Sequence, residues 1–129
     1  FAYPLAQTGK FLPPASMALD AADKASERPA GLPMGARIQL NPDFDIDNTL
    51  LSPGAKVVAR ALQEYGAILV DTAGSTVLHA ESGPDQLAKW AGVLAPDDLQ
   101  ALFTADFIAT NFRVIDAGEP LPGVPRPLK

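Results

Sequence analysis

The chain lacks cysteine, has a single histidine, and contains no long apolar run. Without thiols it cannot form a disulfide framework, use a cysteine nucleophile or build a thiolate metal site. One histidine also excludes a multi-histidine zinc or copper centre. The longest apolar run covers only four residues, 67–70, whereas a membrane-spanning helix needs about 20. We therefore predict no membrane span.

Positive charge is scarce as well. Ten Lys and Arg residues stand against 15 Asp and Glu residues, which leaves a net charge of −5. Because like charges repel, nucleic acid and anionic membrane surfaces are poor partners. With 129 residues, 47% hydrophobic and 19% charged, the chain suits one domain with a genuine core.

The first residue and the missing cysteines bear on the compartment. The chain begins with Phe1 instead of methionine, so we expect it to be processed from a longer precursor. The absence of cysteine is compatible with the cytosol but fits an exported bacterial protein. We predict a secreted or periplasmic location.

Three stretches differ in composition. Residues 1–34 are rich in proline and alanine, which predicts the end of a strand at residues 1–3 followed by a long surface loop. Residues 35–117 carry the predicted core. Residues 118–129 contain four prolines and are expected to form an extended tail.

The core is predicted to mix helices and strands. Alternation over residues 37–40 indicates a strand, and Ser52-Pro53 opens a helix that Gly66 closes. Val57, Val58, Ala61, Leu62 and Tyr65 form its expected apolar face. Residues 67–70 are predicted as a strand buried on both faces, and residues 75–81 as its hairpin partner.

Two short helices and a strand complete the expected fold. The helices are predicted after Ser82 and after Ala95, and the strand over residues 112–116, starting as early as Phe107. This is a small α+β domain with a mixed sheet of about four strands, one strong helix and two short ones. Such a sheet barely flanks residues 67–70 on both sides. We therefore expect a second polypeptide segment or subunit, in a hetero-oligomer that completes a larger β-rich fold.

Several residues are candidates for chemistry. Asp71 precedes Thr72-Ala73-Gly74, which partly matches the aspartic-protease signature, although Ala73 interrupts it; the alternative is a hairpin corner in which Asp71 caps its own turn. His79 alternates with Glu81, and a carboxylate partner would make it a general base. Without such a bond it is a surface or structural histidine.

Two further side chains are candidates for catalysis, whereas the single tryptophan is expected to be structural. Tyr65 is a candidate base and Arg37 a candidate cation that neutralises a uronate. Their alternative roles are structural. Trp90 shares a helical spacing with Leu87, which favours the core over a sugar-stacking surface.

Asp43, Asp45 and Asp47 are spaced like the carboxylates of a calcium loop. An EF-hand also needs glycine at its sixth position and glutamate at its twelfth. This chain has Asn48 and Gly54 there, so it has no EF-hand. The expectation is no cofactor, or calcium at a looser site; the alternative is a solvated edge strand.

Residues 32–81 resemble the C-terminal part of a group of larger, uncharacterised exported bacterial proteins. The resemblance rests on residues 32–40, Phe44-Asp45-Ile46, Ser52-Pro53, Ala61-Leu62, Tyr65-Gly66, Asp71 and Gly74. It implies that an N-terminal half precedes the matched segment, and it associates the chain with β-rich proteins of polysaccharide-degrading bacteria.

The expected function is that of one chain, or the C-terminal part, of an exported, carbohydrate-active protein. Glycan cleavage by a glycoside hydrolase needs two carboxylates roughly 5–9 Å apart, whereas a polysaccharide lyase uses a tyrosine or histidine base. The candidate residues are Arg37, Tyr65, Asp71, His79 and Glu81. The alternative is a non-catalytic glycan-binding module or a structural interaction subunit.

Overall fold

A computed structural model describes residues 1–19, 31–80, 83–95, 97–115 and 118–123. Within these ranges the chain has three α-helices and six strands, which confirms the α+β class. The strands form two sheets of three strands each, where the sequence predicted one sheet of about four.

The chain separates into two compact units. Unit 1 comprises Phe1–Ile38, Ala67–Leu78 and Val114–Lys129, and unit 2 comprises Gln39–Gly66 and His79–Arg113. The predicted division at residues 34 and 118 is a different kind of boundary, drawn from composition, and stays a prediction.

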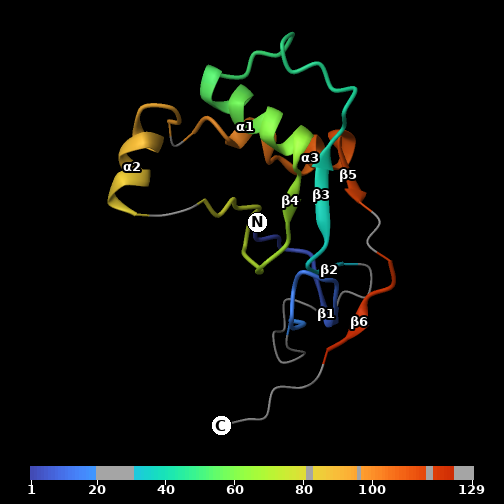
Figure 1. The fold of residues 1–129 in the computed structure, drawn as a ribbon. Helices are drawn as coiled ribbons and strands as arrows, with labels where there is room; N and C mark the ends of the chain where they lie inside the picture. Colours follow the sequence, from blue (N-terminus) through green and yellow to red (C-terminus); the bar gives the residue numbers. More distant parts are fainter. Residues whose placement is uncertain (20–30, 81–82, 96, 116–117, 124–129) are drawn as a thin grey trace. The chain divides into compact units, whose positions relative to one another are not determined.

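One sheet of unit 1 lies where the sequence predicted a loop. Its order is β2-β1-β6, with β2 (Leu32–Met34) parallel and β6 (Leu121–Pro122) antiparallel to β1 (Ala6–Phe11). Figure 1 labels these three strands. Gly9 adopts a φ of 70° inside β1, and this glycine and the flanking prolines hide the strand from a reading of composition. The loop prediction over residues 1–34 is therefore wrong for β1 and β2.

The second sheet has the order β4-β3-β5. It comprises β3 (Arg37–Leu40), β4 (Ala67–Ile68) and β5 (Phe112–Ile115). β3 and β4 are antiparallel, with Arg37 opposite Ile68. The strand predicted over residues 67–70 is thus shorter, and it is not buried throughout: Leu69 is fully buried, but Val70 is 60% exposed.

The second flank of residues 67–71 is covered by the start of the chain itself. The Phe1 amine donates to the Ile68 carbonyl at 2.7 Å, and the Val70 amide donates to the Phe1 carbonyl at 2.9 Å. The Tyr3 amide donates to the Asp71 carbonyl at 3.2 Å. The expectation that only another polypeptide covers this flank is wrong, and a partner now rests on the resemblance alone.

The predicted hairpin is also wrong, because a third segment lies within it. Ala2 bridges to Asp71 in a parallel sense and to Val77 in an antiparallel sense. The Ala2 amide donates to the Val77 carbonyl at 2.9 Å, and the Val77 amide returns a bond to the Ala2 carbonyl at 3.1 Å. Ala2 is 2% exposed, so residues 1–3 fill the place of a hairpin contact.

The helices belong to unit 2. α1 (Pro53–Glu64) begins as predicted, since the Ser52 hydroxyl accepts a bond from the Ala55 amide at 3.1 Å. α2 (Pro84–Ala91) matches the first short helix. The second is reduced to a 3-10 turn, η2 (Gln100–Leu102), and α3 (Ala105–Asn111), capped by Thr104, follows it. The early strand start at Phe107 is therefore wrong.

The core of unit 2 combines aliphatic and aromatic side chains. Leu40 and Leu102 are fully buried. Phe107 of α3 packs edge-on against Phe44 at a centroid distance of 5.3 Å and against Phe112 at 6.3 Å. Within the described residues, none of the helices combines the length and apolar character needed to cross a bilayer.

Candidate functional site

The five predicted catalytic residues do not all fall in one part of the molecule. Arg37 and Asp71 belong to unit 1, and Tyr65 and His79 belong to unit 2. Glu81 lies outside the described residues. The carboxylate that the sequence pairs with His79 therefore has no described position.

Asp71 directs its carboxylate at its own turn. Its Oδ1 accepts a bond from the Thr72 amide at 2.8 Å, and its carbonyl accepts the bond from Tyr3. The side chain is exposed. A catalytic carboxyl commonly owes its altered acidity to burial or to a nearby charge. The Asp71 carboxylate thus makes a local bond to the next amide of the chain.

Tyr65 ends α1 and points its ring into solvent. Its amide donates to the Ala61 carbonyl at 2.8 Å, and its side chain is 65% exposed. A hydrogen bond to Glu64 and the negative charge of that residue raise the pKa of Tyr65 above its usual value. A catalytic tyrosine base needs the opposite shift, because only the phenolate accepts a proton.

Arg37 and His79 are surface residues. Arg37 is exposed on β3, and His79 is exposed in a stretch that is neither helix nor strand. An exposed imidazole or guanidinium meets water on most sides, which weakens its field at a substrate. Neither residue stands in a desolvated environment of the kind that catalysis uses.

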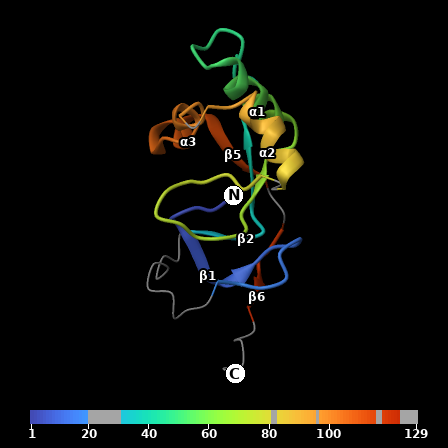
Figure 2. The same ribbon diagram turned by 90° about the vertical axis from the view of Figure 1, so that its left-hand side faces the viewer.

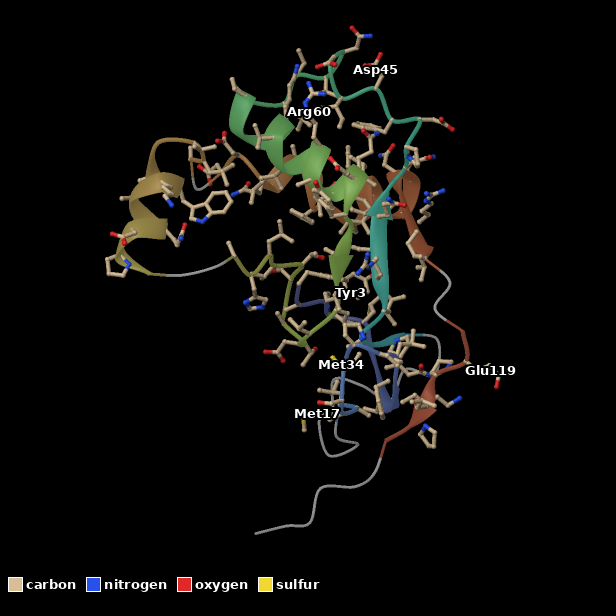
Figure 3. All side chains as sticks on the ribbon, viewed as in Figure 1. Tyr3, Met17, Met34, Asp45, Arg60 and Glu119 are labelled. Carbon is tan, nitrogen blue, oxygen red and sulfur yellow. The ribbon has the colours of Figure 1, made fainter. Side chains whose placement is uncertain are left out.

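The predicted calcium ligands lie on the loop of residues 41–51, which runs beside α1 in Figure 1. Asp47 forms an ion pair with Arg60 of α1. Asp45 accepts bonds from the Asn48 amide at 3.3 Å and from the Asn48 side chain. Figure 3 labels Asp45 on this loop and Arg60 on the helix. These carboxylates therefore have protein partners.

α1 supplies further donors to the same loop. Lys56 Nζ donates to the Asp47 carbonyl at 2.9 Å. Gln63 Nε2 lies 2.9–3.0 Å from the carbonyl oxygens of Asn41, Pro42 and Phe44. Together with Arg60, these side chains stand at spacings of four and three residues, on one face of the helix.

This polar face is the feature that the sequence reading missed. The signal was present, because Lys56, Arg60 and Gln63 recur at helical spacing. The carboxylates of Asp45 and Asp47, two of the three candidate ligands, receive protein donors. Across the described part of the chain, no group of three or more acidic or histidine side chains is placed to hold a metal. Calcium binding by Asp43, Asp45 and Asp47 stays a prediction.

The aromatic residues differ in how far they are exposed. The phenylalanines are buried or half-buried, whereas Tyr65 and Trp90, both in unit 2, are exposed by 65% and 36%. The prediction that Trp90 belongs to the core is therefore wrong. Trp90 lies near the end of α2, one turn after Gln86. An aromatic ring with a polar amide one turn away is a combination suited to sugar binding.

Comparison of the chain with protein-family models, curated proteins and solved structures finds no match.

Proposed function

We propose that the chain is a non-catalytic glycan-binding module of an exported protein, and that unit 2 makes the contact. The observation that carries the proposal is the selective exposure of its two polar-tipped aromatic residues, Tyr65 and Trp90. The phenylalanines of the same unit are half-buried. Tyr and Trp combine a large apolar face with a hydrogen-bonding edge, which suits the C–H faces and hydroxyl groups of a pyranose.

The net charge of the chain favours a neutral glycan over an acidic one. The chain carries a net charge of −5, which disfavours acidic polysaccharides through long-range repulsion. The proposed ligand is therefore a neutral glycan, such as a β-glucan or xylan, in preference to a polyuronate.

Glycan cleavage has less support than binding. The exposed Asp71 carboxylate bonds the next backbone amide, and the raised pKa of Tyr65 opposes a role as base. A hydrolase would need two carboxylates held on opposite sides of one bond. Binding requires only the exposed rings and nearby polar groups.

Trp90 is the only tryptophan, so its fluorescence reports directly on its own surroundings. We expect neutral polysaccharides to change this emission saturably and polyuronates to leave it unchanged. The same mixtures should release no new reducing ends and no unsaturated uronate. New reducing ends or uronate absorbance would instead support the enzyme.

Alanine variants test the two aromatic residues by calorimetric titration. Trp90→Ala or Tyr65→Ala should weaken binding at least about tenfold, as expected for aromatic residues that dominate a binding surface. Val93→Ala, an exposed apolar residue of the same unit, serves as the matched control and should bind normally. A glycan that binds both aromatic variants at full strength would contradict the proposal.

The proposal includes the location and a partner. Export rests on the lack of cysteine and on the resemblance of residues 32–81, and cell fractionation tests it. A second polypeptide segment or subunit is proposed on the resemblance alone. Native mass measurement of the protein from its source would detect such a companion.

A further inference from the structure

Side chains of α1 bond the 41–51 loop at both of its ends, with charged groups at one end and a neutral amide at the other. At the Asp47 end, the charged side chains of Arg60 and Lys56 hold the carboxylate and the carbonyl of one residue. At the Asn41 end, the neutral Gln63 amide meets three carbonyl oxygens. The loop therefore runs against the direction of the helix, from its last turn towards its first (Figure 1).

The Asp47 end is the weaker one. The side chains of Arg60 and Asp47 are 55% and 72% exposed, and ion pairs at such exposure contribute little and are screened by salt. Lys56 also bonds from an exposed position. Dissolved ions therefore compete with both fastenings.

The Asn41 end is supported from several directions. The Asn41 amide donates to the Asn111 carbonyl at 2.8 Å, and Gln63 offers its own carbonyl to Gln39 Nε2 at 2.8 Å. Gln39 in turn accepts bonds from the Arg113 side chain at 2.7 and 3.1 Å. Apart from the two bonds of Arg113, these bonds join uncharged groups, and salt screens them far less than an exposed ion pair.

Between the two ends, the loop covers an apolar side chain. Ile46 is 3% exposed, whereas Leu50 is fully exposed at 107%. The Thr49 amide and hydroxyl donate to the Ile46 carbonyl at 3.3 and 2.7 Å. Ile46 thus begins a short turn that ends at Thr49, and Leu50 follows it, so that one apolar side chain is buried and the other exposed.

We propose that the 41–51 loop is a salt-sensitive flap, hinged at residues 41–44 and released first at Asp47. When the flap opens, the side chain of Ile46 becomes exposed, as that of Leu50 already is. The surface of unit 2 at this loop, which carries carboxylates in the closed state, then becomes partly apolar. The ionic strength of the medium sets the balance between these two surfaces, independently of glycan binding at Tyr65 and Trp90.

Residue-resolved amide hydrogen exchange tests the flap. In Arg60→Gln, the amides of Asn48 and Thr49 should exchange about two- to fivefold faster, while those of Asn41 and Phe44 stay as in the wild type. Raising the salt concentration should speed exchange at Asn48 and Thr49 in the wild type and have little effect in Arg60→Gln. Equal acceleration at all four amides, or none, would overturn the proposal.

Two further variants separate the ends from general effects of charge. Gln63→Ala should accelerate exchange at Asn41 and Phe44 to the same extent at low and high salt. Lys89→Gln removes an exposed positive charge from α2 and should leave all four amides unchanged. If Arg60→Gln does not fold, the salt series on the wild-type protein is the test. Exchange rates at Asn48 and Thr49 that do not change with salt concentration would contradict the flap.

Discussion

The two units differ in the interactions that stabilise each of them internally. In unit 1, main-chain hydrogen bonds join segments far apart in sequence, such as Ala2 with Val77 and Gly9 with Gly123. In unit 2, side chains of one helix fasten a neighbouring loop, as Gln63 and Arg60 do for residues 41–51. Figure 2 labels the three helices and the strands β1, β2 and β6 of the unit 1 sheet.

This difference predicts which substitutions each unit tolerates. Main-chain pairing depends on where the backbone runs, so a substitution harms unit 1 chiefly where a new side chain blocks a close approach. Hydrogen bonds and ion pairs from side chains depend on particular polar groups, so removing those groups should destabilise unit 2. Glycines that lie against another backbone provide the sharpest tests.

The largest effect is expected at Gly35 of unit 1. Its φ is +84°, and a Cβ added there would overlap the Leu12 carbonyl. The Leu12 amide also donates to the Met34 carbonyl at 2.7 Å, so the two backbones cannot separate without losing that bond. Gly35→Ala should reduce the free energy of unfolding by about 3 kcal/mol, measured by urea denaturation.

Gly118→Ala is the matched control, because Gly118 has a φ of +85° but nothing within 4 Å of the added Cβ. It should lose only the conformational term, about 1 kcal/mol. If both variants lose the same free energy of unfolding, the overlap with the Leu12 carbonyl adds no cost. Close backbone contact would then not explain which substitutions unit 1 tolerates.

A smaller effect is expected at Gly54 of unit 2. Gly54 lies in α1, where replacing glycine by alanine ordinarily stabilises by about 1 kcal/mol. Here the added Cβ would overlap the Val93 carbonyl, and we expect a net loss of about 1–2 kcal/mol. Gly92→Ala, with a φ of −92° and nothing within 4 Å, should be neutral or slightly stabilising by the same denaturation measurement. A stabilised Gly54→Ala would contradict the packing of residues 93–94 against α1.

α1 shows how far local sequence signals reach. Ser52-Pro53 and Gly66 mark its limits, and the structure confirms the cap at Ser52 and a positive φ of 70° at Gly66. The predicted buried face was right for Leu62 and wrong for Val57, which is 57% exposed. Beside Leu62, the helix buries the small residues Gly54, Ala55 and Ala59. Larger apolar residues dominated the prediction, although a close backbone approach favours small ones.

The pairings of unit 1 had no local signal at all. Nothing in residues 1–3 indicates that they lie between Asp71 and Val77, since that arrangement depends on contacts more than 60 residues apart. A short apolar run such as residues 67–70 shows that a strand needs neighbours but not which segment supplies them. The expectation that only another polypeptide could cover this strand failed for this reason.

The same distinction applies to the candidate site. Residue types alone identified Asp43, Asp45 and Asp47 as potential ligands, but their partners are set by tertiary structure. Arg60 lies 13 residues from Asp47 in the chain, so only the folded path of the loop brings them together. The exposure of Trp90 is likewise a tertiary property that its helical spacing did not reveal.

The loop contacts lead to a smaller prediction for unit 2. Asp47→Asn should reduce the free energy of unfolding by at most about 1 kcal/mol, because the ion pair with Arg60 is exposed. Calcium or a chelator should leave the unfolding midpoint of the wild-type protein unchanged, since Asp45 and Asp47 already have protein partners. A calcium-dependent rise that Asp45→Asn abolishes would instead support the calcium site predicted from the sequence.

The smallest effect concerns proton binding at the end of α1. Glu64 raises the pKa of Tyr65 by accepting its hydrogen bond and by its negative charge, so the phenol keeps its proton to a higher pH and the bond is lost as the pH rises through that pKa. Glu64→Gln removes the charge and should lower the pKa of Tyr65 towards its usual value of about 10. Ultraviolet titration of tyrosinate measures this shift, and Tyr65→Phe separates the signal of Tyr65 from that of Tyr3. An unchanged titration in Glu64→Gln would show that Glu64 does not act on this exposed ring.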